Sequence, residues 1–183
     1  MFTNEQTKTI QNSFKDLSFF RRVTKQLDPS VLPQLLAWQE TYVNDYMNFS
    51  YKGEADGNTV FGPITTEELP SIIVSTFSEA IDCAEDILLL KNKGNVVLHY
   101  DVTRQASLTI PLNVTKSCTR FWDDDEKEIC QLYHNGEAYL QNNKAVHSVE
   151  DNGDEVRYFL QLCWHKHNYI YWQNVLEELG YFK

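Results

Sequence analysis

The spacing of apolar residues along the chain changes near residue 86, from a helical period to an alternating one. Before this point, apolar residues recur every three or four positions, which is typical of a helix with one buried face. One such run follows Asp28-Pro29-Ser30, and a second begins at Thr66 and continues to Ala84. We therefore predict that residues 1–86 are mostly helical.

Three shorter segments in this first part are interpreted from local signals. Residues 10–17 have the spacing of a short amphipathic helix. Residues 19–23 fit a strand that joins a sheet edge. Residues 50–63 contain three glycines and a proline, and this composition predicts a loop.

Alternating apolar residues predict a series of short strands after residue 86. The strands are expected at residues 87–90, 96–102, 106–114, 119–122, 128–133, 137–140, 145–149 and 156–164. Eight strands at this spacing, with turn residues between most of them, favour a sandwich or jelly roll over an alternating α/β fold. The apolar face of Trp172, Val175 and Leu176 predicts a last helix that stops at Gly180.

The chain has the size of a single domain, since it contains 183 residues. We expect a mainly β domain over residues 1–183, with its N-terminal helices packed on one sheet. In this prediction residues 1–86 support the β core, residues 87–165 form it, and residues 166–183 form a C-terminal helix.

Two of the predicted strands differ clearly between their faces, because successive side chains of a strand point in opposite directions. Ser107 and Thr109 lie on a polar face, opposite Leu108 and Ile110. In residues 156–164, Arg157 lies on the less apolar face. If helices cover the apolar faces, the polar faces look into the barrel, and Arg157 becomes a buried cation that requires an anion.

Charge and cysteine content exclude several classes of function. The formal net charge of −10 disfavours a nucleic-acid backbone or an anionic membrane surface as partner. The four cysteines lack the spacing of a zinc site or a disulfide framework, so we expect reduced thiols. The chain has no apolar signal core and no apolar run of membrane-spanning length. We expect a soluble, cytoplasmic protein.

Two histidines and an aspartate form a candidate metal site. In an extended strand His99 and Asp101 point the same way, roughly 6–7 Å apart along the backbone. His147, in a strand with apolar neighbours, is the candidate third ligand. Two histidines and one carboxylate with open positions suit non-haem Fe(II) oxygenases. Taken alone, however, His99 and Asp101 are better explained by a surface His–Asp pair, and His147 has the alternative of a core histidine bonded to backbone.

The inward-facing Arg157 on the next predicted strand changes this balance, since a plain metal binder has no use for a buried cation. Together with the local sequences at 108–112, 136–139, 142–149 and 157–160, these residues resemble the Fe(II)/2-oxoglutarate-dependent dioxygenases. The local sequence is most similar to the aspartyl/asparaginyl β-hydroxylase-like and free-proline hydroxylase branch. The resemblance covers about residues 87–165.

The resemblance implies a double-stranded β-helix, a jelly roll like that of the cupins, in which His99, Asp101 and His147 hold Fe(II). It implies that Arg157 pairs with the distal carboxylate of the cosubstrate 2-oxoglutarate, and that O2 is the second cosubstrate. It also implies opposite sheets for residues 145–149 and 156–164, whereas the residues alone favour a hairpin.

Further roles in cosubstrate binding follow from the same resemblance. Ser107 and Thr109 would lie near the other end of 2-oxoglutarate. Many relatives carry a serine where this chain has Phe159, so Tyr133 is our candidate to support the carboxylate instead.

The substrate is the least determined part of the prediction. Arg104, Arg120 and Trp122 are candidates to contact it at the barrel mouth. We expect hydroxylation of an unactivated C–H bond in an amino acid or a peptide residue, with succinate and CO2 as coproducts. The alternative is a non-catalytic, metal-binding jelly roll that acts as a binding or sensor protein. The acidic charge disfavours a nucleic-acid demethylase.

Overall fold

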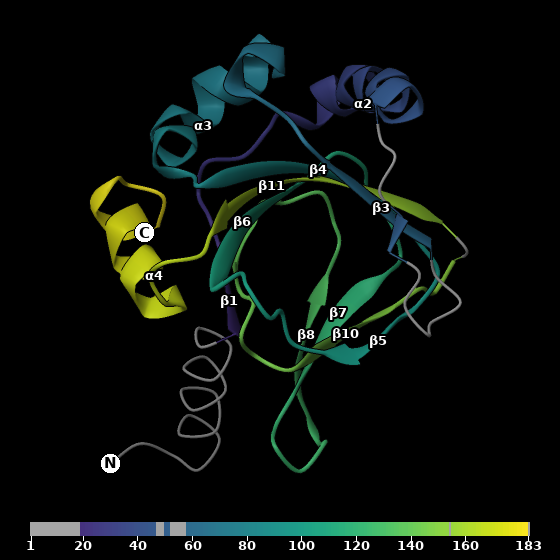
Figure 1. Cartoon of the computed structure of the whole chain (residues 1–183), viewed down its shortest axis with the longest axis vertical. Coiled ribbons are helices and arrows are strands. Elements are labelled where there is room, and N and C mark those ends of the chain that lie inside the picture. The colour runs from purple at the N-terminus through teal and green to yellow at the C-terminus, as the bar shows by residue number, and fades with distance from the viewer. Residues whose placement is uncertain (1–18, 47–49, 52–57, 154, 183) are drawn as a thin grey trace.

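Two antiparallel sheets face each other in a computed structural model, which describes residues 19–46, 50–51, 58–153 and 155–182 (Figure 1). The larger sheet contains, in spatial order, β1 (Phe20–Arg22), β9 (Tyr139–Asn142), β6 (Ala106–Pro111), β11 (Val156–Trp164), β4 (Asp86–Lys93), β3 (Asn58–Pro63) and β2 (Ser50–Tyr51). The smaller sheet contains β5 (Val96–His99), β10 (His147–Glu150), β7 (Cys118–Trp122) and β8 (Glu128–Tyr133).

The chain passes from one sheet to the other at almost every connection from β4 to β11. Within the described series β4 to β11, only β7 and β8 are consecutive strands that pair with each other. This path, with four strands of the β4–β11 series in each sheet, is the predicted double-stranded β-helix, and the prediction is confirmed. The hairpin favoured by the residues of 145–164 is wrong, because β10 and β11 lie in opposite sheets.

The helices lie on the outer face of the larger sheet (Figure 1). They are η1 (Pro29–Val31), α2 (Leu32–Tyr46), η2 (Thr66–Glu68), α3 (Ser71–Cys83) and α4 (Tyr169–Glu178). Side chains cap several of them: Asp28 accepts from the amide of Ser30, and Asn168 accepts from the amide of Tyr171. Within the described residues, no helix is long and apolar enough to cross a membrane.

Two expectations about local structure need correction. Residues 50–63 are not only a loop, because β2 and β3 extend the larger sheet beyond β4. Pro63 is compatible with β3 because it is the last residue of that strand. Strand β5 ends at His99, so Asp101 follows the strand instead of lying within it. The helix predicted over residues 10–17 lies outside the described residues.

Strand β11 lies between two different environments. Its outward side chains, among them Leu160, Leu162 and Trp164, are fully buried in a core with the helices. Its inward side chains, among them Arg157 and Gln161, face the interior of the barrel and are also buried. The predicted division into an apolar outer face and a polar inner face is therefore correct.

We expect Leu160→Ala to lower the free energy of unfolding by about 2–5 kcal/mol, because the deletion leaves a cavity in a core that cannot fully collapse. Urea denaturation of the wild type and the variant measures the difference. Ile170→Ala is the control, since Ile170 is 54% exposed on α4. Equal losses in both variants would contradict the position of the core.

Candidate metal centre

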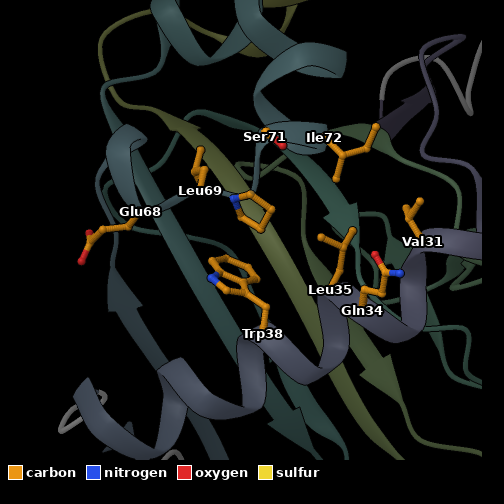
Figure 2. Close-up of a pocket in the computed structure, with 9 residues that line it drawn as sticks. Val31, Gln34, Leu35, Trp38, Glu68, Leu69, Ser71 and Ile72 are labelled. Carbon is orange, nitrogen blue, oxygen red and sulfur yellow. The ribbon is translucent and has the colours of Figure 1, made fainter.

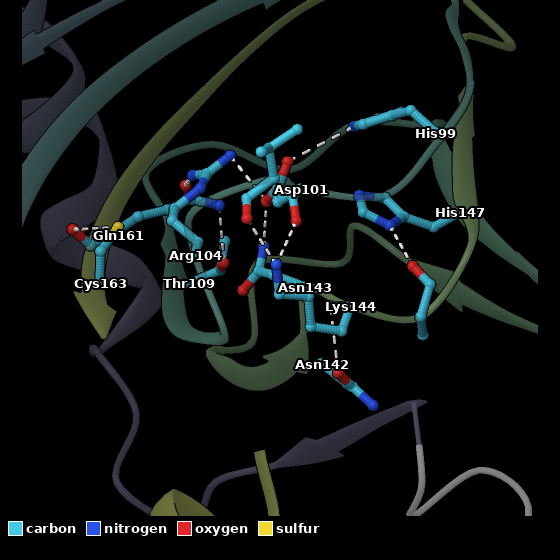
Figure 3. Close-up of polar contacts among 12 residues, drawn as sticks. His99, Asp101, Arg104, Thr109, Asn142, Asn143, Lys144, His147, Gln161 and Cys163 are labelled. Carbon is cyan, nitrogen blue, oxygen red and sulfur yellow. Dashed lines mark hydrogen bonds and ion pairs between the residues drawn. The ribbon is translucent and has the colours of Figure 1, made fainter. Parts of the chain in front are cut away.

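His99, Asp101 and His147 meet in space (Figure 3). His99 ends β5, His147 begins β10, and the two residues lie opposite each other in the antiparallel pair. One ligand atom from each of the three residues lies within 4.8 Å of the others. Among the described residues this is the one such group of His, Cys, Asp or Glu side chains.

Carbonyl groups of the backbone set the tautomer of both imidazoles. Nδ1 of His99 lies 2.8 Å from the carbonyl oxygen of Val97, and Nδ1 of His147 lies 2.8 Å from that of Ala145. A carbonyl oxygen can only accept, so each Nδ1 carries the hydrogen and each Nε2 keeps its lone pair. Nε2 of His99 lies 3.8 Å from Oδ1 of Asp101.

The Asp101 carboxylate is held through one oxygen. Its Oδ2 accepts from Asn143 Nδ2 at 2.6 Å and from Arg104 Nη2 at 2.9 Å. The backbone amide of Asp101 also donates to the carbonyl of Asn143, at 2.9 Å. These contacts fix the turn after β5 and leave Oδ1 directed towards the histidines. Partners of this kind orient a ligand before the metal binds.

Arg104 connects Asp101 to the polar interior of the barrel (Figure 3). Its Nη1 donates to Oε1 of Gln161 at 2.5 Å, and Nε2 of Gln161 donates to Oγ1 of Thr109 at 3.0 Å. A continuous row of hydrogen bonds therefore runs from the carboxylate to the inner faces of β11 and β6.

The electrostatics of the three residues suit a divalent cation. Burial, together with the neighbouring His99, lowers the pKa of His147 to about 4, so that this imidazole is neutral near pH 7. Metal binding requires neutral imidazole and ionised carboxylate. Two imidazole nitrogens and one carboxylate oxygen form a donor set that fits non-haem iron.

Arg157 is almost completely buried in the barrel interior, with 1% exposure. Its Nη1 donates to Oγ of Ser117 at 3.2 Å, and its Nη2 donates to the carbonyl oxygen of Gly94. Gly94 has a φ of 80°, a conformation that glycine adopts readily, and its amide donates to Asp151. The Asp151 carboxylate lies 3.9 Å from Nη1 of Arg157, which is too long for a hydrogen bond.

Burial acts to raise the pKa of Asp151, but the backbone amides of Gly153 and Gly94 outweigh it and lower the pKa below its ordinary value. Asp151 is therefore an anion at neutral pH. Burial also lowers the pKa of Arg157, although a guanidinium keeps its charge in proteins. Among the described residues, the buried cation thus has an anion nearby without a direct hydrogen bond to it.

Sequence reasoning missed three side chains of this interior. Tyr139 lies opposite Thr109 on paired strands and is buried. Tyr139 belongs to the predicted strand 137–140, and strand alternation could have identified it as a side chain of the barrel interior. His134 and Asn143 are also buried, at 2% and 1% exposure, and both lie at turns that sequence patterns do not orient.

Ser107 and Thr109 lie on the inner face of β6, with Ser107 fully buried and opposite Cys163. Ser107 and Thr109 therefore lie, together with Arg104 and Arg157, in the barrel interior or at its mouth.

Three predicted site residues do not join the others. Tyr133 is 57% exposed, and its hydroxyl donates to Gln131. Arg120 pairs with Glu128 and Glu150, on the face of β7 opposite to Phe121, which contacts His147. Trp122 shares the strand face of Arg120 and donates to Ser148. Strand alternation turns these two side chains outward.

The sequence matches no protein-family model and no curated protein. Solved structures match most of the chain. A prolyl-4-hydroxylase of Pseudomonas putida is 14% identical, with a TM-score of 0.56 over 84% of this chain and 97% of that one. A prolyl hydroxylase of Trichoplax adhaerens, in complex with a hypoxia inducible factor peptide fragment, is 13% identical, with a TM-score of 0.57 over 90% and 94%.

The α-ketoglutarate-dependent carbocyclase SnoK of nogalamycin biosynthesis is 13% identical, with a TM-score of 0.58 over 90% of this chain and 84% of that one. This chain has the fold of the 2-oxoglutarate- and Fe(II)-dependent oxygenases. At this identity the likeness shows the fold.

A separate surface groove of about 490 Å³ lies on the helical side of the molecule (Figure 2). It runs between α2 and the η2–α3 segment and is lined by Leu35, Trp38, Leu69 and Ile72 among others. The larger sheet separates this groove from the three ligand residues, so it is not part of the metal centre.

We expect Asn143→Ala to weaken metal binding by about 10–100-fold, because it removes the donor that orients Asp101. Anaerobic titration with Fe(II), or with Co(II) followed by its visible spectrum, measures the affinity. Asn174→Ala on the exposed face of α4 is the control. Unchanged affinity in Asn143→Ala would show that Asp101 is oriented without this contact.

We also expect His134 to make the protein less stable in acid. Burial, with Arg157 and Arg22 nearby, lowers the pKa of His134 from 6.5 to about 3. Between these values the unfolded chain binds a proton that the folded chain does not, so stability falls as the pH drops through this window. His134→Gln should therefore lose less stability than wild type between about pH 7 and pH 4, by urea denaturation.

The exposed His167 supplies the control, His167→Gln, whose pH dependence should follow the wild type. The explanation fails if His134→Gln loses as much stability on acidification as the wild type does.

Proposed function

We propose that this protein is an Fe(II)- and 2-oxoglutarate-dependent dioxygenase that hydroxylates an unactivated C–H bond. The observation that carries the proposal is the convergence of three oriented ligand atoms beside a barrel interior that contains a buried guanidinium. The fold, which this chain shares with 2-oxoglutarate- and Fe(II)-dependent oxygenases, supports it. Membership of the β-hydroxylase-like and free-proline hydroxylase branch stays a prediction.

His99, Asp101 and His147 would hold the iron through Nε2, Oδ1 and Nε2. When bound, Fe(II) with 2-oxoglutarate and O2 supplies the oxidative decarboxylation to succinate and CO2, and the transfer of one oxygen atom to the substrate. A set of three protein ligands leaves positions for the cosubstrates, as a two-histidine, one-carboxylate site requires.

Arg157 would bind the distal carboxylate of 2-oxoglutarate. Its nearest described anion, Asp151, lies beyond hydrogen-bond distance. The guanidinium can therefore donate to the carboxylate of 2-oxoglutarate in the bidentate geometry that an Arg–carboxylate pair favours. The buried Tyr139, opposite Thr109, is better situated than the exposed Tyr133 to support this contact. Thr109 and Ser107 remain candidates to line the rest of the cosubstrate pocket.

The remaining side chains would orient these groups and exclude water. Arg104 and Asn143 hold Asp101 so that one oxygen is available to the metal. Phe121 lies against His147, with 6.0 Å between ring centroids, and Phe19 and Phe20 pack behind it. This apolar packing keeps solvent away from one side of the buried histidine.

We expect anaerobic addition of Fe(II) and 2-oxoglutarate to give the weak visible charge-transfer band of the chelate. His99→Ala should abolish the band, because it removes a ligand. Arg157→Ala should raise the Kd of 2-oxoglutarate by about 10–100-fold, the equivalent of one charge-assisted hydrogen bond of about 1.5–3 kcal/mol. The Kd of 2-oxoglutarate for Arg157→Lys should lie between those of the wild type and Arg157→Ala, because lysine keeps the positive charge but lacks the planar guanidinium group.

Arg120→Ala is the matched control, because Arg120 lies outside the barrel and should leave the band and the Kd unchanged. Near-ultraviolet circular dichroism of each variant checks that its core is folded. Metal binding without any band would contradict the oxygenase and favour a non-catalytic metal-binding jelly roll.

A further inference from the structure

Exposed apolar side chains are concentrated around the ligand residues of β5. Val97, Leu98, Tyr100 and Val102 are 51%, 40%, 58% and 81% exposed. Single exposed apolar residues are ordinary on a protein surface, but several of them within one short stretch of chain favour a site of interaction. Leu98 points to the face of β5 opposite to Val97 and His99, and Tyr100 and Val102 follow the strand. We call Val97, Leu98, Tyr100 and Val102 the β5 surface. It occupies the same stretch of chain as His99 and Asp101.

Strand β5 is an edge strand of the smaller sheet, and in the described part of the chain it pairs with β10 alone. Among the described residues its other edge therefore has no strand partner, and its backbone groups can pair with another strand. Edge strands are usually protected by charged residues or proline. The edge strand β8 contains Glu128, and β1 contains Arg21 and Arg22, whereas β5 reads Val-Val-Leu-His.

The metal centre is more accessible from β5 than from β10. The side chain of His99 is 35% exposed, whereas His147 has only 5% exposure and packs against Phe121. Because β5 ends at His99, an extended chain paired with its free edge runs past His99 and towards Asp101. Such a chain would carry one of its side chains to the metal.

The charges around the centre favour a polypeptide over a free amino acid. Binding a free amino acid requires partners for its carboxylate and its ammonium group. Arg104, the cation paired with the ligand Asp101, is already bonded to Asp101 and Gln161, and the Lys144 ammonium already donates to the backbone carbonyls of Asp101 and Val102. The β5 surface itself is uncharged and apolar. Backbone pairing plus apolar contacts is the mode by which sheet edges bind extended peptides.

We propose that the free edge of β5 and the β5 surface bind an extended, apolar segment of a polypeptide substrate and present one of its residues to the metal centre. This inference rests on the proposed function and names its substrate class. A second copy of this chain paired through β5 is the competing occupant.

The test uses full-length protein loaded with Fe(II) and 2-oxoglutarate without O2, and a synthetic peptide set. Each peptide has about ten residues, enough to cover a strand of common length. Valine or leucine occupies alternate positions, and each amino acid in turn occupies the centre. We expect some members to bind, measured by fluorescence anisotropy, and to slow hydrogen–deuterium exchange at residues 96–99.

Leu98→Lys and Val102→Lys should each raise the Kd by about tenfold or more, because a charge then faces the apolar segment. Ile170→Lys on α4, where Ile170 is 54% exposed, should bind as the wild type does. Both β5 variants should keep the charge-transfer band, since neither residue is a ligand. With O2 present, bound peptides should stimulate succinate formation and free amino acids should not.

The proposal is overturned if no peptide binds, if Leu98→Lys binds as well as wild type, or if free amino acids alone stimulate turnover. It is also overturned if the wild type sediments as a dimer that Leu98→Lys dissociates. These outcomes are distinct from failure of the proposed function. If the charge-transfer band appears but no peptide binds, only the proposed peptide-binding role of β5 is refuted. If a peptide binds but the charge-transfer band does not appear, only the proposed oxygenase function is refuted.

Discussion

The burial of one face of the larger sheet under the helices is the constraint on which the site depends. Leu160, Leu162 and Trp164 of β11 are fully buried in that core. Because strand side chains alternate, Arg157 and Gln161 have to point into the barrel. A shift of register by a single residue would exchange the two faces and bury the apolar set in the wrong layer. The hydrophobic core thus determines where the polar residues lie.

Hydrogen bonds in the barrel interior fix the tautomers of the histidines and the orientation of the Asp101 carboxylate. Backbone carbonyls set the tautomer of His99 and His147. Asn143 and Arg104 select one oxygen of Asp101, and Arg104 continues through Gln161 to Thr109. The ligand atoms are therefore oriented before any metal arrives. The same row of contacts connects the metal centre to the region of the barrel that contains Tyr139.

The two sides of the β-helix differ in how they meet solvent. The larger sheet is covered by helices on its outer face and is extended by β1 at one edge and by β3 and β2 at the other. The smaller sheet ends at β5, which has an open edge in the described structure. His147 is accordingly buried and His99 is half-exposed. Access to the centre is asymmetric because, among the described residues, β10 lies between two strands whereas β5 lies at the edge of its sheet.

The sequence by itself determined the class of fold, because the change from helical to alternating spacing is a local property of the chain. It also determined the candidate ligands and the inward Arg157, since residue type and strand alternation are local too. The loop predicted for residues 50–63 was wrong for β2 and β3, because the glycines and the proline were interpreted as turn signals although Gly62 and Pro63 end β3. Nor did the residues of 145–164 show whether β10 and β11 pair as a hairpin or lie in opposite sheets.

Only the tertiary structure decided which polar residues meet. Asn143 reaches Asp101 across 42 positions of sequence, and no local pattern encodes such a contact. Tyr133 and Tyr139 both belong to predicted strands, yet one is exposed and the other buried, because the position of each strand in its sheet fixes the face that is covered. Arg120 and Trp122 point outward because Phe121, the residue between them, is buried against His147. Pairing and packing bring distant residues together, and these are properties of the whole fold.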